Sequence, residues 1–438
     1  MIKALDIFAW AVIAKTIFNV IRFSIVQIWR YFYTNQEVRP DFSENVILTI
    51  LIPLYREANI ADQIASMAHK LVDESPGNVR VILICSSRET REDEENTINK
   101  LRRSFGFFKK NQNIKIIESD GNDQCKGDQL NQGLKYIEQH FKPAEKCVHW
   151  IGVYDADSLP QKGTIKEVIA RASRKNVRVM QQAPLYIGRW ERFNSSYHRL
   201  LIDSFCLSRA LYSHMFSFKE AIGYLFSGGK WDFRLHHLIG HGYFIEEGLL
   251  NELGNFSPPS CDTSLGYKIS FANYHIELLQ SYDISEVPDN LRDIRNQGLV
   301  WFNGCELYQK EYANTKNAHC SKKTTIRSKI RLLQVIMTNA SWAFLPIIWF
   351  LLLTVALIIQ HSVLLWIYAI AIWLAYRQIS WWHMLTVCKE NRASIGYVRG
   401  LLVPLFSPIY VIYGCISPLR YYYLKAFRRK IKLIKTSR

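Results

Sequence analysis

The sequence has 438 residues, of which 49% are hydrophobic, and a formal net charge of +17 at pH 7. A chain of this length is expected to form more than one structural module. Its composition fits neither a fully membrane-embedded transporter nor an ordinary soluble enzyme. Many basic residues flank apolar segments, and no zinc-finger, homeodomain or RNP pattern occurs, so the charge indicates anchoring against anionic membrane lipids and not nucleic-acid binding.

Residues 5–29 form an apolar segment long enough to cross a bilayer. Lys15, Asn19 and Arg22 share one face of the predicted helix. No small-residue cleavage site follows a compact apolar region, which argues against a cleaved signal peptide. We favour a spanning helix packed against other helices; the alternative is an amphipathic helix lying in the interface.

From about residue 46, short apolar runs alternate with segments of helical apolar spacing. Strands are predicted at residues 46–53, 80–85, 114–118, 148–154 and 177–184. Helices are predicted at residues 58–72, through the 90s and from about 127 to 140. This alternation predicts βαβ units in an α/β layer, with ligands beyond the carboxyl ends of the strands. Residues 190–300 are less periodic and rich in aromatic residues, glycine and histidine, which indicates a substrate-facing half.

The strand predicted at 148–154 ends in two carboxylates, Asp155 and Asp157, and Pro160 prevents its regular continuation. Residues i and i+2 of a strand project to the same side, so both carboxylates could reach one hard cation. Mg²⁺ and Mn²⁺ favour such oxygen ligands, often together with substrate phosphates. For a lone Asp-X-Asp, a solvated acidic turn is the competing interpretation.

The C-terminal third is predicted to contact the membrane. Residues 324–340 read as a basic amphipathic helix at the surface, and residues 341–359 and 363–385 as a hairpin of spanning helices. The loop 360–362 lacks Lys and Arg while both flanks are basic, so the positive-inside rule places the α/β domain in the cytoplasm, on a cell or inner membrane. Residues 398–424 are apolar but interrupted by Pro404, Pro408, Gly414 and Pro418. Their course stays open between re-entrant, interfacial and kinked spanning segments.

Two residue types give weaker signals. The nine cysteines are scattered without a Cys-X-X-Cys pair, which favours a reducing compartment over a disulfide framework or a structural zinc site. His236, His237 and His241 cluster without partner ligands at metal spacing, so a polar loop is favoured over a metal site.

Several short motifs follow one another in a fixed order. They are Ile-Pro-Leu-Tyr-Arg-Glu-Ala (52–58), Lys-Gly-Asp-Gln-Leu-Asn (126–131), Asp-Ala-Asp (155–157), Gln-Gln-Ala-Pro (181–184), Gly-His-Gly (240–242), Cys-Asp-Thr-Ser-Leu-Gly-Tyr (261–267) and Gln-Gly-Leu-Val-Trp (297–301). In their order and spacing, over about residues 47–304, the chain resembles the membrane-integrated family-2 glycosyltransferases. That group includes cellulose, chitin and hyaluronan synthases and ceramide glucosyltransferase.

The resemblance implies a Rossmann-like GT-A fold and a role for each matching residue. It places Pro53, Tyr55 and Glu57 beside the nucleotide base, Lys126 beside the donor, and Asp155 and Asp157 on Mg²⁺ or Mn²⁺. It places Gly240 and His241 beside the acceptor, Asp262 as general base, and Gln297 and Trp301 on the acceptor sugar. Physically, a lysine at a helix start suits a diphosphate, and a tryptophan offers a platform for a sugar ring, although a lone tryptophan is more often a core residue.

Three positions depart from the family's pattern. Cys85 ends the second strand, where the family commonly has an aspartate near the nucleoside, and Cys261 replaces the glutamate before the base. Val300 stands where the family has the arginine of Gln-X-X-Arg-Trp, and Arg292 or Arg295 are candidate substitutes.

The resemblance divides the chain into an N-terminal membrane helix (1–40), a GT-A domain (41–320) and a C-terminal part (321–438) with an interface helix, transmembrane helices and a basic tail. It implies inverting transfer, in which Asp262 deprotonates the acceptor hydroxyl while a nucleoside diphosphate leaves. The expected partners are a nucleotide-sugar donor, a UDP-sugar in particular, a growing polysaccharide or lipid-linked acceptor, membrane lipids, and a second copy or an export partner. The alternative, motivated by the three departures, is a non-catalytic membrane scaffold that binds nucleotide or glycan.

Overall fold

The computed structural model describes most of the chain. The described residues are 2–34, 45–89, 96–106, 111–120, 125–141, 147–174, 176–187, 199–209, 211, 235, 238–258, 260–288, 290–317, 326–359, 363–387 and 397–429. His236, His237 and the loop 360–362 lie outside this set, so the expectations placed on them are not addressed.

A mixed sheet forms the centre of the α/β part. Its strands are β1 (Val46–Leu54), β2 (Val79–Cys85), β3 (Ile114–Glu118), β4 (Val148–Val153), β5 (Leu159–Pro160), β6 (Val179–Ile187), β7 (Tyr243–Glu246) and β8 (Glu277–Glu286). Their order across the sheet is β3-β2-β1-β4-β7-β6-β8-β5. β1 pairs in parallel with both β2 and β4, and β6 pairs in parallel with β8. The carboxyl ends of these strands therefore lie at one edge of the sheet.

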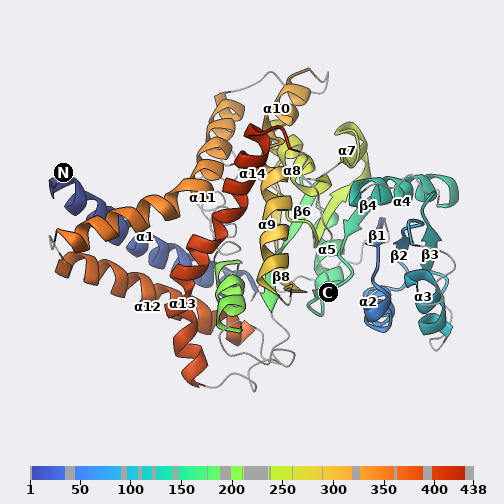
Figure 1. The fold of residues 1–438 in the computed structure, drawn as a ribbon. Coiled ribbons are helices and arrows are strands. Elements are labelled where there is room, and N and C mark those ends of the chain that lie inside the picture. Colours follow the sequence, from blue (N-terminus) through green and yellow to red (C-terminus); the bar gives the residue numbers. More distant parts are fainter. Residues whose placement is uncertain are drawn as a thin grey trace.

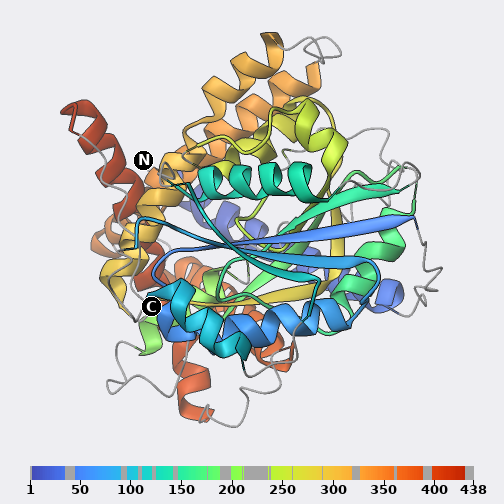
Figure 2. The same cartoon turned by 90° about the vertical axis from the view of Figure 1, so that its right-hand side faces the viewer.

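Helices cover both faces of this sheet (Figure 2). A short 3-10 turn, η1 (Ala58–Ile60), leads into α2 (Ala61–Asp73), which shares one core with α3 (Thr97–Gly106) and α5 (Thr164–Ala172). The other core contains α4 (Lys126–His140), α7 (Glu247–Glu252), α8 (Cys261–Phe271) and the helical residues 199–209. β1 serves both cores: Leu51 belongs to the second, and Ile50 and Ile52 to the first, as the alternation of strand side chains requires.

The strands predicted from the sequence are confirmed to within three residues at each end, and the structure adds β7, which was not predicted. This strand pairs antiparallel with both β4 and β6. The Gly242 N–H donates to the carbonyl of Val153 at 2.8 Å, so the chain enters β7 beside the carboxyl end of β4. A strand that begins at this edge has to run against its neighbours.

Among the described residues, four helical segments are long and apolar enough to span a membrane, and they lie at the two ends of the chain. They are α1 (Ile2–Thr34), α11 (Ile326–Ile358), α12 (Val363–Val387) and the pair α13 (Tyr397–Gly414) and α14 (Ile416–Ala426). Figure 1 shows α1, α12 and the second half of α11 extending together away from the sheet. Of the helices that follow the sheet, α9 (Leu291–Cys305) packs against α14, and α10 (Tyr308–Asn317) packs against α8 and contacts α11.

The boundary expected near residue 340, between an interface helix and a first span, is absent. Residues 326–358 form one continuous helix, whose first half packs on α8 of the α/β body. Arg331 is 1% exposed and donates to the carbonyl of Ser270 and, at 2.9 Å, to Asn273 Oδ1, both at the carboxyl end of α8. Arg331, which the charge pattern assigned to lipid anchoring, instead joins α11 to α8.

Arg331→Met is therefore expected to destabilise the protein by roughly 2–3 kcal/mol, because it leaves a buried carbonyl without its charged donor. The measurement is the thermal unfolding midpoint of purified protein in detergent and in nanodiscs. Lys329→Met is the matched control, since Lys329 is exposed on the same helix. Equal effects of both substitutions, present only in anionic lipid, would restore the lipid-anchor interpretation.

The segment at 398–424, whose course the sequence left open, is helical with a break at Cys415. α13 lies along α12, while α14 packs against α9. The Ser417 hydroxyl donates to the carbonyl of Arg295 at 2.9 Å, and the ring of Tyr421 lies 5.3 Å from that of Phe302. The last described helix thus contacts the α/β body directly.

Candidate active site

Lys126 is the centre of a polar cluster at the carboxyl edge of the sheet. Its ammonium group donates to Asp155 Oδ1 at 2.5 Å and to the carbonyl oxygen of Gly240. Lys126 is the first residue of α4, whose start is held by a capping box between Cys125 and Asp128. Three predicted residues that are remote in sequence therefore meet at one point.

The charge of Lys126 is maintained by its neighbours. Burial disfavours the ammonium and by itself would lower the pKa of Lys126. The negative charge of Asp155 and, more weakly, that of Asp262 outweigh burial and raise the pKa of Lys126 above its ordinary value. The cluster thus holds a permanent cation between two aspartates.

Asp262 lies in the first turn of α8, and its carboxylate and the ammonium group of Lys126 both lie close to Gly240. A Cβ atom placed on Gly240 would lie 3.2 Å from Asp262 Oδ2 and 3.9 Å from Lys126 Nζ. Asp262 Oδ1 accepts a hydrogen bond from Ser260 Oγ at 3.3 Å. Beside it, burial first and the Asp262 charge second raise the pKa of Cys261, so this position presents a neutral thiol.

Gly240→Ala is expected to lower turnover by about 10-fold with little change in the unfolding midpoint, because displacements well under 1 Å at reacting groups are costly. The added methyl would press on the carboxylate of Asp262 and leave the sheet untouched. The measurement is kcat and KM for the donor, and we expect the loss mainly in kcat. Gly77→Ala is the control, since a Cβ there meets nothing within 4 Å.

A second group of side chains lies beside Asp155. Asp157 is 7% exposed, and the ring of buried His241 shares a 2.5 Å hydrogen bond between Nδ1 and Asp283 Oδ2. The Ser158 hydroxyl donates to the same oxygen of Asp283 at 2.9 Å. Burial opposes the imidazolium form, but Asp283 and then Asp155 and Asp157 outweigh it and raise the pKa of His241.

Asp283 belongs to no motif, and sequence reasoning missed it. It lies on β8, is fully buried and fixes the orientation of His241. Its only sequence signal is an acidic residue within the mixed polar and apolar run 277–286, a pattern that is also typical of a solvated edge strand. Its role becomes visible only when β8 is placed in the sheet.

The residues predicted for the nucleotide base lie one strand away, at the end of β1. The ring of Tyr55 faces the guanidinium of Arg88 at 4.1 Å and that of Arg56 at 5.2 Å. Gln129 of α4 donates to the carbonyl of Leu54 at 2.9 Å, which ties this end of β1 to the helix that begins with Lys126. Pro53 is the next-to-last residue of β1, and Glu57 is buried at the start of η1.

At the end of β2, the departure at Cys85 is accompanied by a polar arrangement of its own. Cys85 is buried, and burial first and Glu89 second raise its pKa to about 12, so the thiol is neutral at physiological pH. Arg88 Nε donates to the hydroxyl of Ser86 at 3.0 Å while its guanidinium faces Tyr55. A serine and an arginine thus stand where the family commonly has an aspartate.

Gln297 and Trp301 lie one turn apart on α9. Gln297 Oε1 is buried and accepts no hydrogen bond from the part of the chain that the structure describes. The guanidinium of Arg209 lies 3.7 Å above the centre of the Trp301 ring, and the ring of Phe205 is nearly parallel to Trp301 at 6.3 Å. Trp301 therefore presents a cation-covered face, which the sequence did not predict.

Aromatic contacts join Trp301 to the carboxylate cluster. Phe205 contacts Tyr186 with ring centres 6.2 Å apart, and Tyr186 meets His241 edge-on at 6.0 Å. The Tyr186 hydroxyl lies 3.4 Å from His241 Nε2. One continuous set of side chains thus runs from α9 to the end of β4.

A comparison with protein families gives a match over more than half of the chain. The model described as glycosyl transferase family group 2 matches residues 150–385, which include Asp155, Asp262 and Trp301. The chain belongs to this family. It is a family-2 glycosyltransferase, and the α/β fold with flanking apolar helices expected from its sequence is confirmed.

No curated protein matches this glycosyltransferase, but solved structures do. Mannosyltransferase PcManGT from Pyrobaculum calidifontis, in complex with GDP-Man and Mn²⁺, is 15% identical with a TM-score of 0.48, covering 95% of this chain and 99% of that one. S. aureus TarS 1-349 in complex with UDP-GlcNAc is 13% identical with a TM-score of 0.40, covering 88% and 93%. GalNAc-T7 with UDP, GalNAc and Mn²⁺ is 10% identical with a TM-score of 0.38, covering 68% and 58%.

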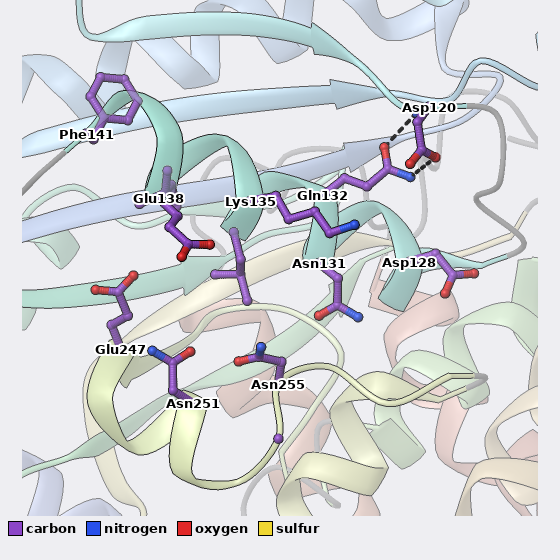
Figure 3. A pocket seen from close by; sticks show the side chains of 13 residues that line it. Asp120, Asp128, Asn131, Gln132, Lys135, Glu138, Phe141, Glu247, Asn251 and Asn255 are labelled. Carbon is purple, nitrogen blue, oxygen red and sulfur yellow. Dashed lines mark hydrogen bonds between the residues drawn. The ribbon is translucent and has the colours of Figure 1, made fainter.

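A separate polar groove of about 920 Å³ lies between α4 and α7 of this glycosyltransferase. Figure 3 shows Asn131 and Glu138 of α4 facing Glu247, Asn251 and Asn255, and Asp128 and Lys135 also line the groove. Its lining contains none of the predicted site residues. The groove shares α4 with the Lys126 cluster but occupies the outer side of that helix.

Proposed function

We propose that this protein is an inverting membrane glycosyltransferase that moves a sugar from a nucleotide-sugar donor, a UDP-sugar in particular, to a glycan or lipid-linked acceptor. The observation that carries the proposal is the meeting of Lys126, Asp155, Gly240 and Asp262 at the carboxyl edge of the sheet. A cation for a leaving diphosphate and a carboxylate for an incoming hydroxyl then both lie beside one glycine.

The donor half would be built from the ends of β1 and β4 and the start of α4. The amino end of a helix attracts anions through its partial positive charge and unpaired N–H groups, and Lys126 adds a full charge at that point. Tyr55, held beside Arg56 and Arg88, offers an aromatic surface for the nucleoside. The diphosphate would therefore lie between the nucleoside at Tyr55 and the sugar at Asp262.

Asp262 would act as the general base. Its carboxylate removes the proton from the acceptor hydroxyl as the oxygen forms a bond to the anomeric carbon. The bond from that carbon to the diphosphate breaks in the same step, so the configuration inverts and the electron pair leaves with the nucleoside diphosphate. The cation of Lys126 stabilises the negative charge that gathers on this leaving group.

The donor set of Asp155 and Asp157 fits Mg²⁺ or Mn²⁺, because such ions are often held by one or two carboxylates together with substrate phosphates. Among the described residues, no group of three or more His, Cys, Asp and Glu side chains surrounds a single position. The remaining ligands would come from the donor diphosphate and water. A bound cation would supply further charge neutralisation at the leaving group.

The acceptor half would be built from α9. The buried oxygen of Gln297, which has no protein donor among the described residues, suits a sugar hydroxyl. Basic residues flank the hairpin of α11 and α12, which favours a cytoplasmic catalytic domain. The acceptor would then enter the site from the side of the membrane. A second copy or an export partner would be needed if a polymer has to cross the membrane.

The experiment is to measure nucleoside diphosphate release by protein in nanodiscs, supplied with a panel of nucleotide sugars and either Mn²⁺, Mg²⁺ or a chelator. We expect release with one donor, loss of release with the chelator, and a product of inverted anomeric configuration by NMR. Asp157→Asn should raise the metal concentration needed. Nucleotide binding without release for any donor and acceptor would favour the non-catalytic scaffold.

A further inference from the structure

The glutamine that opens the Gln-Gln-Ala-Pro motif of β6 contacts the loop that carries Gly240 and His241. Gln181 is fully buried, and its Oε1 accepts a hydrogen bond from the backbone N–H of Ile239 at 2.9 Å. Its Nε2 donates to the carbonyl oxygens of His241 at 2.9 Å and Gly242 at 3.1 Å. One side chain therefore bonds to the backbone on both sides of Gly240.

The backbone at Gly240 is itself a part of the site. Its carbonyl oxygen accepts a hydrogen bond from the ammonium group of Lys126, which also donates to Asp155. Glycine has no side chain that could pack against the surroundings, so the position of this carbonyl depends on how the neighbouring backbone groups are held. The bonds from Gln181 to Ile239 and His241 hold those groups.

The chemistry of the loop requires an amide at position 181. The N–H of Ile239 needs an acceptor and the carbonyl of His241 needs a donor, and a neutral amide supplies both from one planar group. An ionised glutamate would only accept hydrogen bonds, and a methionine of similar shape would form none of these bonds. Buried backbone groups that lose their partners are costly, so a replacement at position 181 should shift the loop.

The far end of the loop is held in another way. The N–H of Gly242 donates to the carbonyl of Val153 at 2.8 Å, and the N–H of Gln182 donates to the carbonyl of Gly242 at 2.7 Å. These backbone bonds join the loop to the ends of β4 and β6. Gln181 extends this connection across Gly240 to Ile239.

Building on the proposed function, we propose that Gln181 is a positioning residue for Lys126. It holds the loop so that the carbonyl of Gly240 meets the ammonium group that stabilises the leaving diphosphate. Gln181 has an exposure of 0%, so it acts through the loop and not by contact with the donor or the acceptor. A strand of the sheet thereby sets the place of a cation that belongs to α4.

The test is a double-mutant cycle of Gln181→Met and Lys126→Gln, measured on the full chain in nanodiscs. Methionine keeps the approximate shape of glutamine and forms none of its bonds to the loop. In the wild-type background, Gln181→Met should lower kcat by about 10-fold, because small displacements at reacting groups are costly. In the Lys126→Gln background the further loss should be less than about 2-fold, because residues that act as a unit are not additive. The same cycle on UDP affinity should show a loss of about 3-fold in the wild-type background and none in the other.

Gln182→Met is the matched control. Gln182 is equally buried on the same strand, but its side chain bonds to Tyr154, Thr164 and Ser281. We expect it to lower the unfolding midpoint about as much as Gln181→Met does, and any loss of kcat that it causes should be equal in the two backgrounds. Gln181→Asn, which keeps the amide on a shorter side chain, should lose less activity than Gln181→Met.

Equal losses from Gln181→Met with and without Lys126→Gln would overturn the proposal, since Gln181 would then stabilise the loop without setting the place of the cation. Where Gln181→Met lowers the unfolding midpoint too far for an assay, the cycle with Gln181→Asn decides in the same way. UDP affinity can be measured without sugar transfer, so the coupling to Lys126 is tested even when every donor fails. Failure of every donor would count against the proposed function, whereas coupling in UDP affinity would still support the role of Gln181.

Discussion

Asp262→Asn is expected to reduce sugar transfer by roughly 10²- to 10⁴-fold while nucleotide binding stays within about 2-fold of the wild type. The amide has the shape of the carboxylate but accepts no proton, so the acceptor hydroxyl stays protonated when the donor bond has to break. Asp262 faces Gly240 and hydrogen-bonds Ser260, and both contacts tolerate an amide. Initial rates at saturating donor and acceptor, together with direct titration of UDP, measure the two quantities.

Ser260→Ala is the control, because it removes the 3.3 Å hydrogen bond to Asp262 and leaves the carboxylate in place. We expect a loss of less than about 10-fold, since a single neutral hydrogen bond of this kind contributes about 1 kcal/mol. A wild-type rate for Asp262→Asn would exclude Asp262 as the base and direct attention to Asp157 and Asp283.

Lys126→Gln is expected to lower turnover by about 10²- to 10³-fold, because removal of one charged donor from a developing anion has effects of this size. The same substitution should weaken UDP binding by about 10-fold, which corresponds to 1.4 kcal/mol. It also leaves Asp155 and Asp262 without the cation between them, so added Mn²⁺ should recover part of the binding. Lys126→Arg should recover less turnover than binding, because the planar guanidinium does not reproduce the contact to the carbonyl of Gly240.

Lys135→Gln is the matched control for Lys126. Lys135 lies on the same helix, is exposed and lines the outer groove (Figure 3). Its removal tests whether any positive charge on α4 suffices for UDP binding. Equal losses for the two substitutions would mean that α4 attracts the donor by its overall charge, without a defined contact at Lys126.

The donor half could be predicted from the sequence because its signals are local. β1, β2 and β4 are continuous apolar runs, and each ends in turn residues within the same short stretch of chain. The positions of Lys126 and Asp155 at the edge of the sheet follow from where those runs end. Their direct contact does not, since it depends on the packing of α4 against β1.

β8 was not predicted because some of its buried positions hold polar residues that contact His241. Asp283 and Ser285 occupy buried positions of this strand, so polar residues stand where an apolar pattern would mark the side facing the core. β7 is only four residues long and follows a glycine at positive φ. Hydrophobicity patterns detect strands whose inward-facing side chains are apolar. The inward-facing side chain of Asp283 on β8 is instead a carboxylate that hydrogen-bonds His241.

The misplaced boundary near residue 340 has a different cause. Composition changes there from basic to apolar, which suggested two helices, but no glycine or proline interrupts the backbone between Ile326 and Pro346. A helix ends where its backbone hydrogen bonding is interrupted, whereas a change from basic to apolar side chains indicates only that the helix passes from a polar to an apolar environment. The contact between Arg209 and Trp301 was equally inaccessible, because it joins segments that only the completed fold brings together.

The packing of α14 on α9 determines how this enzyme can be handled in the laboratory. Leu299 and Phe302 of α9 are covered by Tyr421 and its neighbours, and Gly298 allows Ser417 to approach the helix backbone. A shortened chain that stops before residue 397 would expose this apolar strip of the helix that carries Gln297 and Trp301, and strips of this kind promote aggregation. We therefore expect a truncated chain without α13 and α14 to aggregate. Biochemical work on this enzyme has to begin with the full-length protein in a lipid or nanodisc environment.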